Sequence, residues 1–394
     1  MVYALCQKTF LSLWSYPNPL RSDRKELCDV LVVCGNNILI FSVKQVKLGK
    51  EKEGSTHHDR WRRKAIENSV RQIKGAEKQL KRMQYVIRSD NTPGTKLPDS
   101  KDLVVHRIAV ALGSEGRVPI QSGKFNGSFV HVLDEVSINV ILNTLDTISD
   151  LTEFLLYAEK LLAISDSLIV AGGYEDLMGF YILNERKLPP PGALIVIDNG
   201  FLQTLMKRPE YIRKKSQDQV SYFWDSLIDF LREGLTYSIE GCLPTLDELE
   251  QIVRIMALEN RLSRRILSNS FREWHTQGRS RSRICVSPKG ITYVFLACPS
   301  HIDRTLRRAE LGARCFVARG RYKDSKIVVG IATEVYGPGE SSFDAVLLDM
   351  PTWNDDHEKK MKELVEQRGL FKNPIETKVS QWEYPPEDDT KGAP

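Results

Sequence analysis

The chain has 394 residues and a formal net charge of +5, with 41% hydrophobic and 27% charged residues. This composition is ordinary for a globular protein with a buried core, and it argues against a fibrous or wholly disordered chain. No run of about 18 apolar residues occurs, so no membrane-spanning helix is expected. The seven scattered cysteines and the polar residues within the N-terminal apolar run indicate a cytoplasmic protein with reduced thiols and no signal peptide.

The charges are distributed in blocks along the chain. Residues 44–88 carry 14 Lys and Arg against 5 Asp and Glu, and residues 260–326 carry 16 against 4. Residues 131–259 reverse the balance with 10 against 21, as do residues 340–394 with 7 against 13. Two basic blocks separated by acidic ones favour an anionic partner, and nucleic acid is the commonest one. The alternative is that the basic and acidic blocks pair with each other within the fold.

Hydrophobic patterning predicts an α/β domain over residues 1–135. A short helix and a turn precede a β-hairpin with strands over 29–33 and 38–43, joined by the turn residues Gly35-Asn36-Asn37. An amphipathic helix over 61–87 then precedes two further strands. The order of hairpin, helix and strand indicates an α/β core. The two further strands are expected over 103–112 and 128–133.

The rest of the chain predicts a mainly helical region over 136–278, a small α/β domain over 279–375 and a disordered tail over 376–394. The helices expected in the middle region cover 135–145, 149–164, 174–186, 209–233 and parts of 245–277, with one strand over 193–197. The elements expected in the last domain are strands over 291–297, 314–318, 327–333 and 345–348 and a helix over 302–313.

The segment from Lys25 to Gln45 contains the residues best suited to catalysis. Asp29 opens the first hairpin strand and Lys44 closes the second, so the hairpin returns both to the same end of the sheet. Asp29 offers hard oxygen ligands for a divalent cation, and Glu26 offers a second carboxylate. Lys44 can orient a water molecule or stabilise charge on a phosphate. Together they suit metal-assisted attack of water on a phosphodiester; the alternative is a simple salt bridge at the sheet edge.

This segment resembles the PD-(D/E)XK nuclease superfamily over roughly residues 20–112. In that family an acid at the start of one strand is followed by acid-x-Lys at the end of the next. Asp29 matches the first acid, Lys44 matches the catalytic lysine, and Glu26 matches the acid that many members carry just before the sheet. The resemblance implies a restriction-endonuclease-like mixed sheet flanked by helices.

The resemblance also implies roles for three further residues. The backbone carbonyl of Val43 is expected to be a metal ligand, and Gln72 on the following helix is expected to be a polar active-site residue. Ser42 stands where the family usually has Asp or Glu, and a hydroxyl is a weaker metal ligand than a carboxylate. Three explanations remain open: Glu26 supplies the charge, an acid on the helix such as Glu67 replaces it, or the site is inactive and the fold is kept for binding.

The function implied by the resemblance is hydrolysis of phosphodiester bonds in DNA, with RNA as the alternative substrate, in the presence of Mg²⁺ or Mn²⁺. A role in defence against foreign nucleic acid, including viral nucleic acid, follows only by family analogy. One competing hypothesis is a catalytically degenerate nuclease fold that binds nucleic acid or partner subunits. Another is a structural protein whose charge blocks dock partner subunits. A homo-oligomer is compatible with each of them.

Basic residues at two places in the chain are the expected nucleic-acid contacts. The first set lies on the helix expected over 61–87, and the second lies in the run RSRSR. Arginines that recur at near-helical steps before that run extend the second basic face, unless the whole stretch is an ordinary solvated surface. The first set is Arg62, Arg63, Lys64 and Arg71; the second is Arg279, Arg281 and Arg283, extended by Arg261, Arg264, Arg265 and Arg272.

Overall fold

The computed structural model describes most of the chain, as two compact units that each contain a sheet of their own. Unit 1 is Met1–Ile212 and unit 2 is Arg213–Pro394. The described residues are 1–11, 13–47, 55–114, 120–163, 168–236, 246–276, 282–335, 342–372 and 382–384. Within these stretches, no helix is long and apolar enough to cross a membrane.

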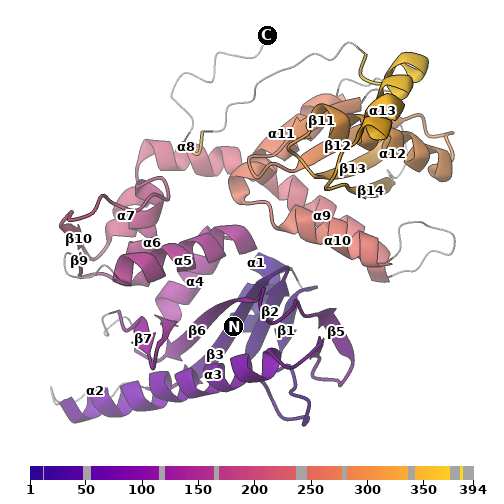
Figure 1. The fold of residues 1–394 in the computed structure, drawn as a ribbon. Helices are drawn as coiled ribbons and strands as arrows, with labels where there is room; N and C mark the ends of the chain where they lie inside the picture. The colour runs from indigo at the N-terminus through magenta and orange to yellow at the C-terminus, as the bar shows by residue number, and fades with distance from the viewer. Residues whose placement is uncertain are drawn as a thin grey trace. The chain divides into compact units, whose positions relative to one another are not determined.

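A six-stranded mixed sheet forms the centre of unit 1 (Figure 1). Its strands, in spatial order, are β1 (Ser15–Pro17), β2 (Val30–Cys34), β3 (Asn37–Gln45), β6 (Val104–Leu112), β8 (Ser128–Leu133) and β7 (Gly123–Phe125). The pairs β3–β6 and β6–β8 are parallel, and the other pairs are antiparallel. The predicted class, α/β with a mixed N-terminal sheet flanked by helices, is confirmed.

The predicted hairpin is formed by β2 and β3. All of β2 and residues 38–42 of β3 are buried, as expected for strands covered on both faces. Gly35 turns the chain with a φ of 58°, a left-handed conformation that glycine adopts without strain. The register pairs Val30 with Phe41, so that Asp29 lies opposite Ser42 one step further along.

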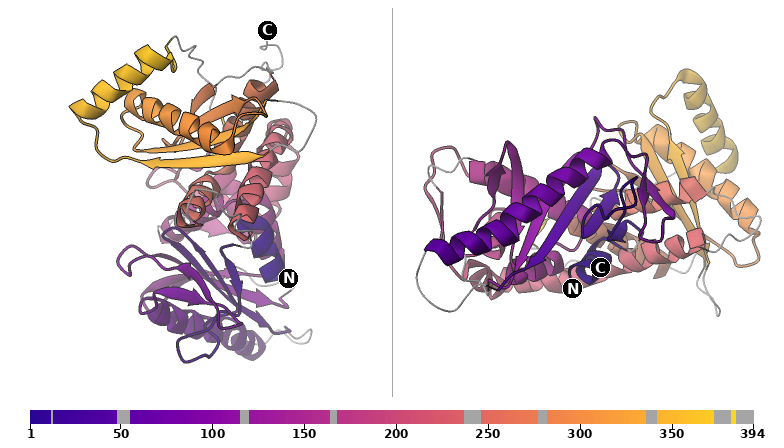
Figure 2. Two further views of the ribbon diagram at one scale, coloured as in Figure 1. Left: turned by 90° about the vertical axis from the view of Figure 1, so that its right-hand side faces the viewer. Right: turned by 90° about the horizontal axis from the view of Figure 1, so that it is seen from below.

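A long helix covers one face of this sheet (Figures 1 and 2). It consists of α2 (Ser55–Arg62), a π-helical turn (Arg63–Glu67) and α3 (Asn68–Leu80). Buried α3 side chains at helical spacing, including Val70 and Ile73, pack in the same core cluster as the hairpin residues.

The helix expected over 61–87 is wrong at both ends. It begins before Trp61 and ends at Leu80, and Tyr85–Ile87 forms β4, paired antiparallel with β5 (Pro93–Lys96). The reason is that Tyr85–Ile87 combines aromatic and β-branched side chains, which favour a strand once a partner strand is present.

The other face of the sheet is covered by α1 (Val2–Phe10) and α4 (Glu135–Thr144), which contact β2, β6 and β8. α5 (Ile148–Ala163), α6 (Tyr174–Leu183) and α7 (Phe201–Met206) follow. A further two-stranded sheet, with parallel strands, is formed by β9 (Leu168–Val170) and β10 (Ile195–Ile197). β9 was not expected, whereas β10 lies within the strand expected over 193–197.

Two histidines are buried on the neighbouring strands β6 and β8. His106 and His131 are both 0% exposed. His131 Nδ1 lies 2.5 Å from the hydroxyl oxygen of Tyr174, and its Nε2 lies 3.1 Å from Oε1 of Glu159. Burial lowers the pKa of both imidazoles, and it brings the pKa of His106 to about 4 with a further contribution from nearby His131. Both rings are therefore held neutral at neutral pH.

We expect this burial to make the fold acid-sensitive. The unfolded chain binds a proton on His106 below about pH 6.5, whereas the folded chain does so only near pH 4, so stability falls as the pH drops through this interval. Between about pH 7.5 and about pH 5 the loss attributable to His106 is about 2 kcal/mol. Urea unfolding of wild type and His106→Gln at both pH values measures it, with His301→Gln, which alters an exposed histidine, as the control. Equal pH dependence in wild type and His106→Gln would contradict the assignment.

Unit 2 contains a four-stranded sheet with the order β11 (Ser282–Val286), β12 (Thr292–Cys298), β13 (Ile327–Glu334) and β14 (Phe343–Asp349). Only β12 and β13 are parallel, and α12 (Arg304–Arg321) connects them. The other described helices of this part of the chain are α8 (Pro209–Asp218), which begins just before the unit, a short 3₁₀ turn (Gln219–Ser221), α9 (Tyr222–Thr236), α10 (Leu246–Ala257), α11 (Arg261–Thr276) and α13 (Asp355–Arg368).

The strand expected over 314–318 is wrong, because these residues lie inside α12. Leu311, Cys315 and Ala318 recur at helical spacing and pack in the core beside the sheet, and this longer pattern overrides the local strand preference. β11 was also not expected. The domain boundaries after residues 135 and 278 stay predictions, and of the tail over 376–394 only residues 382–384 lie within the described part.

Candidate active site

Asp29 and Lys44 lie together at one end of the hairpin. Nζ of Lys44 is 3.6 Å from Oδ2 of Asp29. The two side chains are 26% and 34% exposed, so the pair faces solvent. The sequence-based expectation that these groups meet at a common, solvent-accessible point therefore agrees with the geometry, and so does the simpler expectation of a salt bridge.

The carboxylate of Asp29 is fixed by the backbone of the neighbouring strand. Its Oδ2 accepts a hydrogen bond from the N–H of Val43 at 2.8 Å. No described residue donates a hydrogen bond to its other oxygen, Oδ1. One carboxylate oxygen is therefore used to position the side chain, and the other is available to water or a cation.

Ser42 and Gln72 extend this group of polar side chains toward α3. Ser42 is fully buried, and its hydroxyl donates a hydrogen bond to Oε1 of Gln72 at 2.8 Å. Ser42 faces α3 because Ile38 and Ile40 alternate with it on the same side of β3, and both pack in the core cluster that contains the helix. Ser42 is also the residue opposite Asp29 in the hairpin register, and Asp29, Ser42, Lys44 and Gln72 are together called the Asp29–Lys44 site.

Neither proposed second acid is joined to this site by a described contact. Glu26 is exposed in the segment before β2, where it forms a backbone bridge with Leu20. The carboxylate of Glu26 nevertheless affects Cys28. The pKa of this buried thiol is raised well above its usual value, mainly by burial and further by the negative charges of Asp29 and Glu26. Glu67 is exposed on the π-helical turn. Asp29 is therefore the one carboxylate that described contacts link to Lys44 or Ser42.

The oxygen atoms of the site are of the kind that binds a hard divalent cation, but the net charge of the site does not attract one. Carboxylate and amide oxygens from Asp29 and Gln72 are the kind of ligand that Mg²⁺ prefers. However, one carboxylate beside one ammonium leaves no net negative charge to attract the ion. Among the described residues, no group of three or more His, Cys, Asp or Glu side chains could hold a metal. A cation would therefore need negative charge from the substrate, as Mg²⁺ commonly takes from phosphates.

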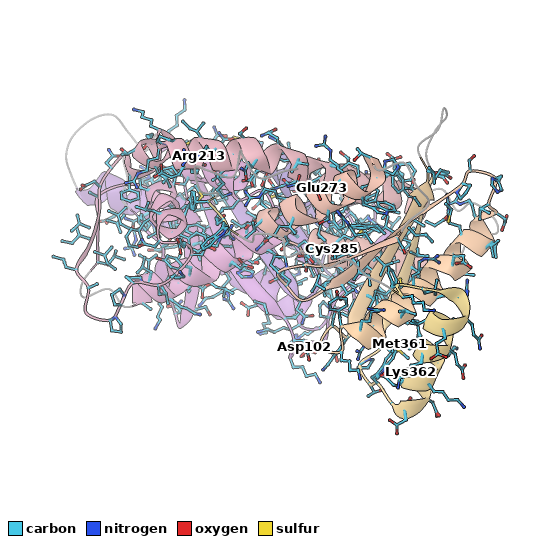
Figure 3. All side chains as sticks on the ribbon, turned by 90° about the horizontal axis from the view of Figure 1, so that it is seen from above. Asp102, Arg213, Glu273, Cys285, Met361 and Lys362 are labelled. Atoms are coloured by element: carbon cyan, nitrogen blue, oxygen red, sulfur yellow. The ribbon has the colours of Figure 1, made fainter. Side chains whose placement is uncertain are left out.

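The first set of predicted nucleic-acid contacts is exposed on the long helix. Arg62, Arg63, Lys64 and Arg71 all lie at exposed positions there, and Arg71 donates a hydrogen bond to Asn68. Of the second set, Arg279 and Arg281 lie outside the described residues. Arg283 on β11 donates to the carbonyl of Ser270 at 2.8 Å and pairs with Glu273 at 3.2 Å; Glu273 and Cys285 mark this region in Figure 3.

The predicted extension of the second basic face is wrong for three of its four arginines. Arg261, Arg264 and Arg265 are only 4–6% exposed. They form ion pairs with Asp225 and Asp218. Helical spacing correctly placed the three on related faces of α11, but that face is turned toward Asp218 at the end of α8 and Asp225 of α9, so here the basic and acidic blocks pair with each other.

Comparisons with protein-family models, curated proteins and solved structures found no match to this chain. No sequence pattern predicts the buried contacts of His131 with Tyr174 and Glu159. Their residues come from three elements far apart in the sequence, so no local spacing marks them.

We expect Asp29 to have a structural role that can be separated from its charge. Asp29→Ala removes the acceptor for the Val43 N–H and should lower the free energy of unfolding by about 1–2 kcal/mol. Asp29→Asn keeps an acceptor oxygen and should change stability much less. Urea unfolding of the two variants measures the difference, and equal losses would show that the hydrogen bond does not hold the site.

Proposed function

We propose that this chain is a divalent-cation-dependent nuclease that hydrolyses phosphodiester bonds of DNA, with its active site in a restriction-endonuclease-like unit 1. The observation that carries the proposal is the 3.6 Å approach of Lys44 to Asp29 at a solvent-accessible strand end. The order of hairpin, helix and parallel strand around the pair supports it. RNA is the alternative substrate, and defence against foreign nucleic acid is the cellular role that the family analogy suggests.

Each residue of the site has a distinct role in this proposal. Asp29 would hold the cation through its other carboxylate oxygen, because the Val43 N–H already holds Oδ2. The cation, when bound, polarises the phosphodiester and lowers the pKa of its bound water. Lys44 orients the attacking water and stabilises charge that develops on the phosphate. The hydrogen bond from Ser42 to Oε1 of Gln72 fixes the amide beside the end of β3.

In this proposal the substrate itself supplies part of the negative charge that a cation needs. The exposed arginines and lysine on the long helix lie on an element that also delivers Gln72 to the site. Contacts from these cations to backbone phosphates would position the nucleic acid without reading its sequence. A phosphate placed beside Asp29 would then supply the negative charge that the Asp29–Lys44 pair lacks.

Plasmid nicking tests the proposal directly. Wild-type protein should convert supercoiled DNA to nicked or linear forms in Mg²⁺ or Mn²⁺ and not in EDTA. Lys44→Ala and Asp29→Asn should reduce the rate by at least about a hundredfold, as expected for loss of a group that stabilises transition-state charge. Lys47→Ala, which alters an exposed lysine three residues further on, is the control and should cleave at the wild-type rate. Equal cleavage by Lys44→Ala and wild type would rule out the assignment of the site.

Substitution of Ser42 tests whether added negative charge strengthens cation binding. Ser42→Asp would add a second carboxylate next to Asp29, and cation affinity rises with the number of charged ligands. The Mg²⁺ concentration for half-maximal cleavage should therefore fall by about tenfold, an effect of about 1.4 kcal/mol. Ser42→Asn, which is similar in size but neutral, is the matched control. The same Mg²⁺ dependence in both variants would show that charge at this position does not limit cation binding.

A second candidate function is favoured by the single carboxylate at the site. If Ser42 marks a degenerate catalytic centre, unit 1 binds nucleic acid without cutting it. Binding that weakens steeply with salt, together with no cleavage in any divalent cation, would support this candidate over the nuclease.

A further inference from the structure

Unit 2 contains a pocket formed by the 3₁₀ turn, the start of α9 and the end of α11. Its volume is about 330 Å³, at the lower end of the range of about 300–1,000 Å³ that ligand sites span. It is therefore large enough for one small organic ligand. The lining residues that matter for the nature of this ligand are Gln219, Phe223, Phe271, Arg272 and His275.

The wall of the pocket is mainly aromatic. Phe271 and His275 lie one turn apart on α11, with ring planes nearly parallel at 16° and centroids 5.9 Å apart. Phe223 of α9 lies against Phe271, with centroids 5.1 Å apart and ring planes at 35°. Phe271 is buried, whereas Phe223 and His275 are partly exposed. Exposed aromatic rings at a pocket can bind another flat ring by stacking.

Arg272 adds a positive charge to this aromatic pocket. It is the one arginine of the predicted extension of the second basic face that is exposed. The acids within two residues of the lining are Asp218, Asp225 and Glu273, and each is paired with an arginine other than Arg272. The charge of Arg272 is thus not compensated by these neighbouring acids, and an anionic group on the ligand would be attracted to it.

The combination of rings and guanidinium favours a flat ring that carries a phosphate. A guanidinium matches phosphate geometry with two parallel hydrogen bonds. The exposed amide of Gln219 adds donor and acceptor groups of the kind that bind the edge of a base. An aliphatic acid would make no use of the aromatic wall, and an uncharged ring would make none of Arg272. A nucleotide uses both.

We propose that this pocket binds one nucleotide. Its base stacks against Phe223 and His275, with Phe271 completing the aromatic wall, and its phosphate is held by Arg272. The nucleotide is either a free nucleoside monophosphate or one unit of a single strand, because both carry a base and a phosphate. The proposal does not rest on the nuclease function, since the pocket shares no residue with the Asp29–Lys44 site.

Isothermal titration calorimetry of the full chain tests the recognition of both parts of the nucleotide. The measurement is made in EDTA, so that no metal-dependent cleavage occurs. Adenosine monophosphate (AMP) should bind at least about tenfold more tightly than adenosine, which lacks the phosphate, or ribose 5-phosphate, which lacks the base. Equal binding of AMP and ribose 5-phosphate would contradict the proposal, because a surface cation alone would explain it.

Two substitutions separate the roles of charge and stacking. Arg272→Gln should weaken AMP binding by at least about tenfold and leave adenosine binding unchanged, because only the phosphate contact is lost. Phe223→Leu should weaken the binding of both ligands, because leucine keeps an apolar side chain without the stacking face. The matched controls are Lys359→Gln on α13 and Phe316→Leu on α12, which do not line the pocket and should bind AMP as the wild type does.

An oligodeoxyadenylate of about eight nucleotides distinguishes the two sources of the ligand. If a strand is the ligand, Arg272→Gln should lower its affinity for the oligonucleotide, and AMP should compete with the strand. If a free nucleotide is the ligand, only AMP binding should depend on Arg272. Circular dichroism checks that the variants fold, and the exposed position of Arg272 keeps the test valid if Phe223→Leu does not. Binding of neither ligand, or binding of both that is unchanged in Arg272→Gln, would overturn the proposal.

Discussion

The register of the β2–β3 hairpin is the constraint on which the candidate site depends. Pairing of Val30 with Phe41 places Asp29 opposite Ser42 and brings its carboxylate to the N–H of Val43. A slip of one residue would turn Ser42 and Lys44 to the opposite face, because side chains alternate along a strand. It would also move Ile38 and Ile40 out of the core that they share with α3. The same apolar burial that stabilises the sheet therefore aligns the polar groups at its end.

Charge has two different uses in this protein. In unit 2, buried arginines on α11 are neutralised by aspartates of the preceding acidic block, and removal of either partner would leave an uncompensated buried charge. On the long helix of unit 1, by contrast, the cations of the first predicted set are exposed. Exposed cations are free to contact a polyanion, whereas paired and buried ones are part of the fold, so the two basic blocks of the sequence are not equivalent.

Both units contain the order of hairpin, helix and parallel strand, yet they carry different residues at the comparable strand ends. In unit 1 the end of β3 carries Lys44 beside Asp29. In unit 2 the end of β12 carries Cys298, paired with Glu334 of β13, and Glu334 is held by the buried Arg307. Burial raises the pKa of Glu334, but hydrogen bonds from Ser342 and Arg307 outweigh it and bring the value to about 2. Here the strand-end carboxylate is paired with Arg307 and Ser342, so the order of elements alone does not define an active site.

Local sequence patterns were sufficient to predict the hairpin, the amphipathic helix that follows it, the strand over 103–112 and the proximity of Asp29 and Lys44. These features depend on local patterns: a glycine turn, an apolar run, helical spacing, and the fact that a hairpin returns its ends to one edge. Tertiary structure decided the rest. The burial of Arg261, Arg264 and Arg265 against aspartates of α8 and α9, the hydrogen bond of Ser42 with Gln72 and the absence of a described contact from Glu26 to Asp29 depend on which distant segments pack together. Spacing along one element fixes which side chains share a face, but what that face packs against depends on the whole fold.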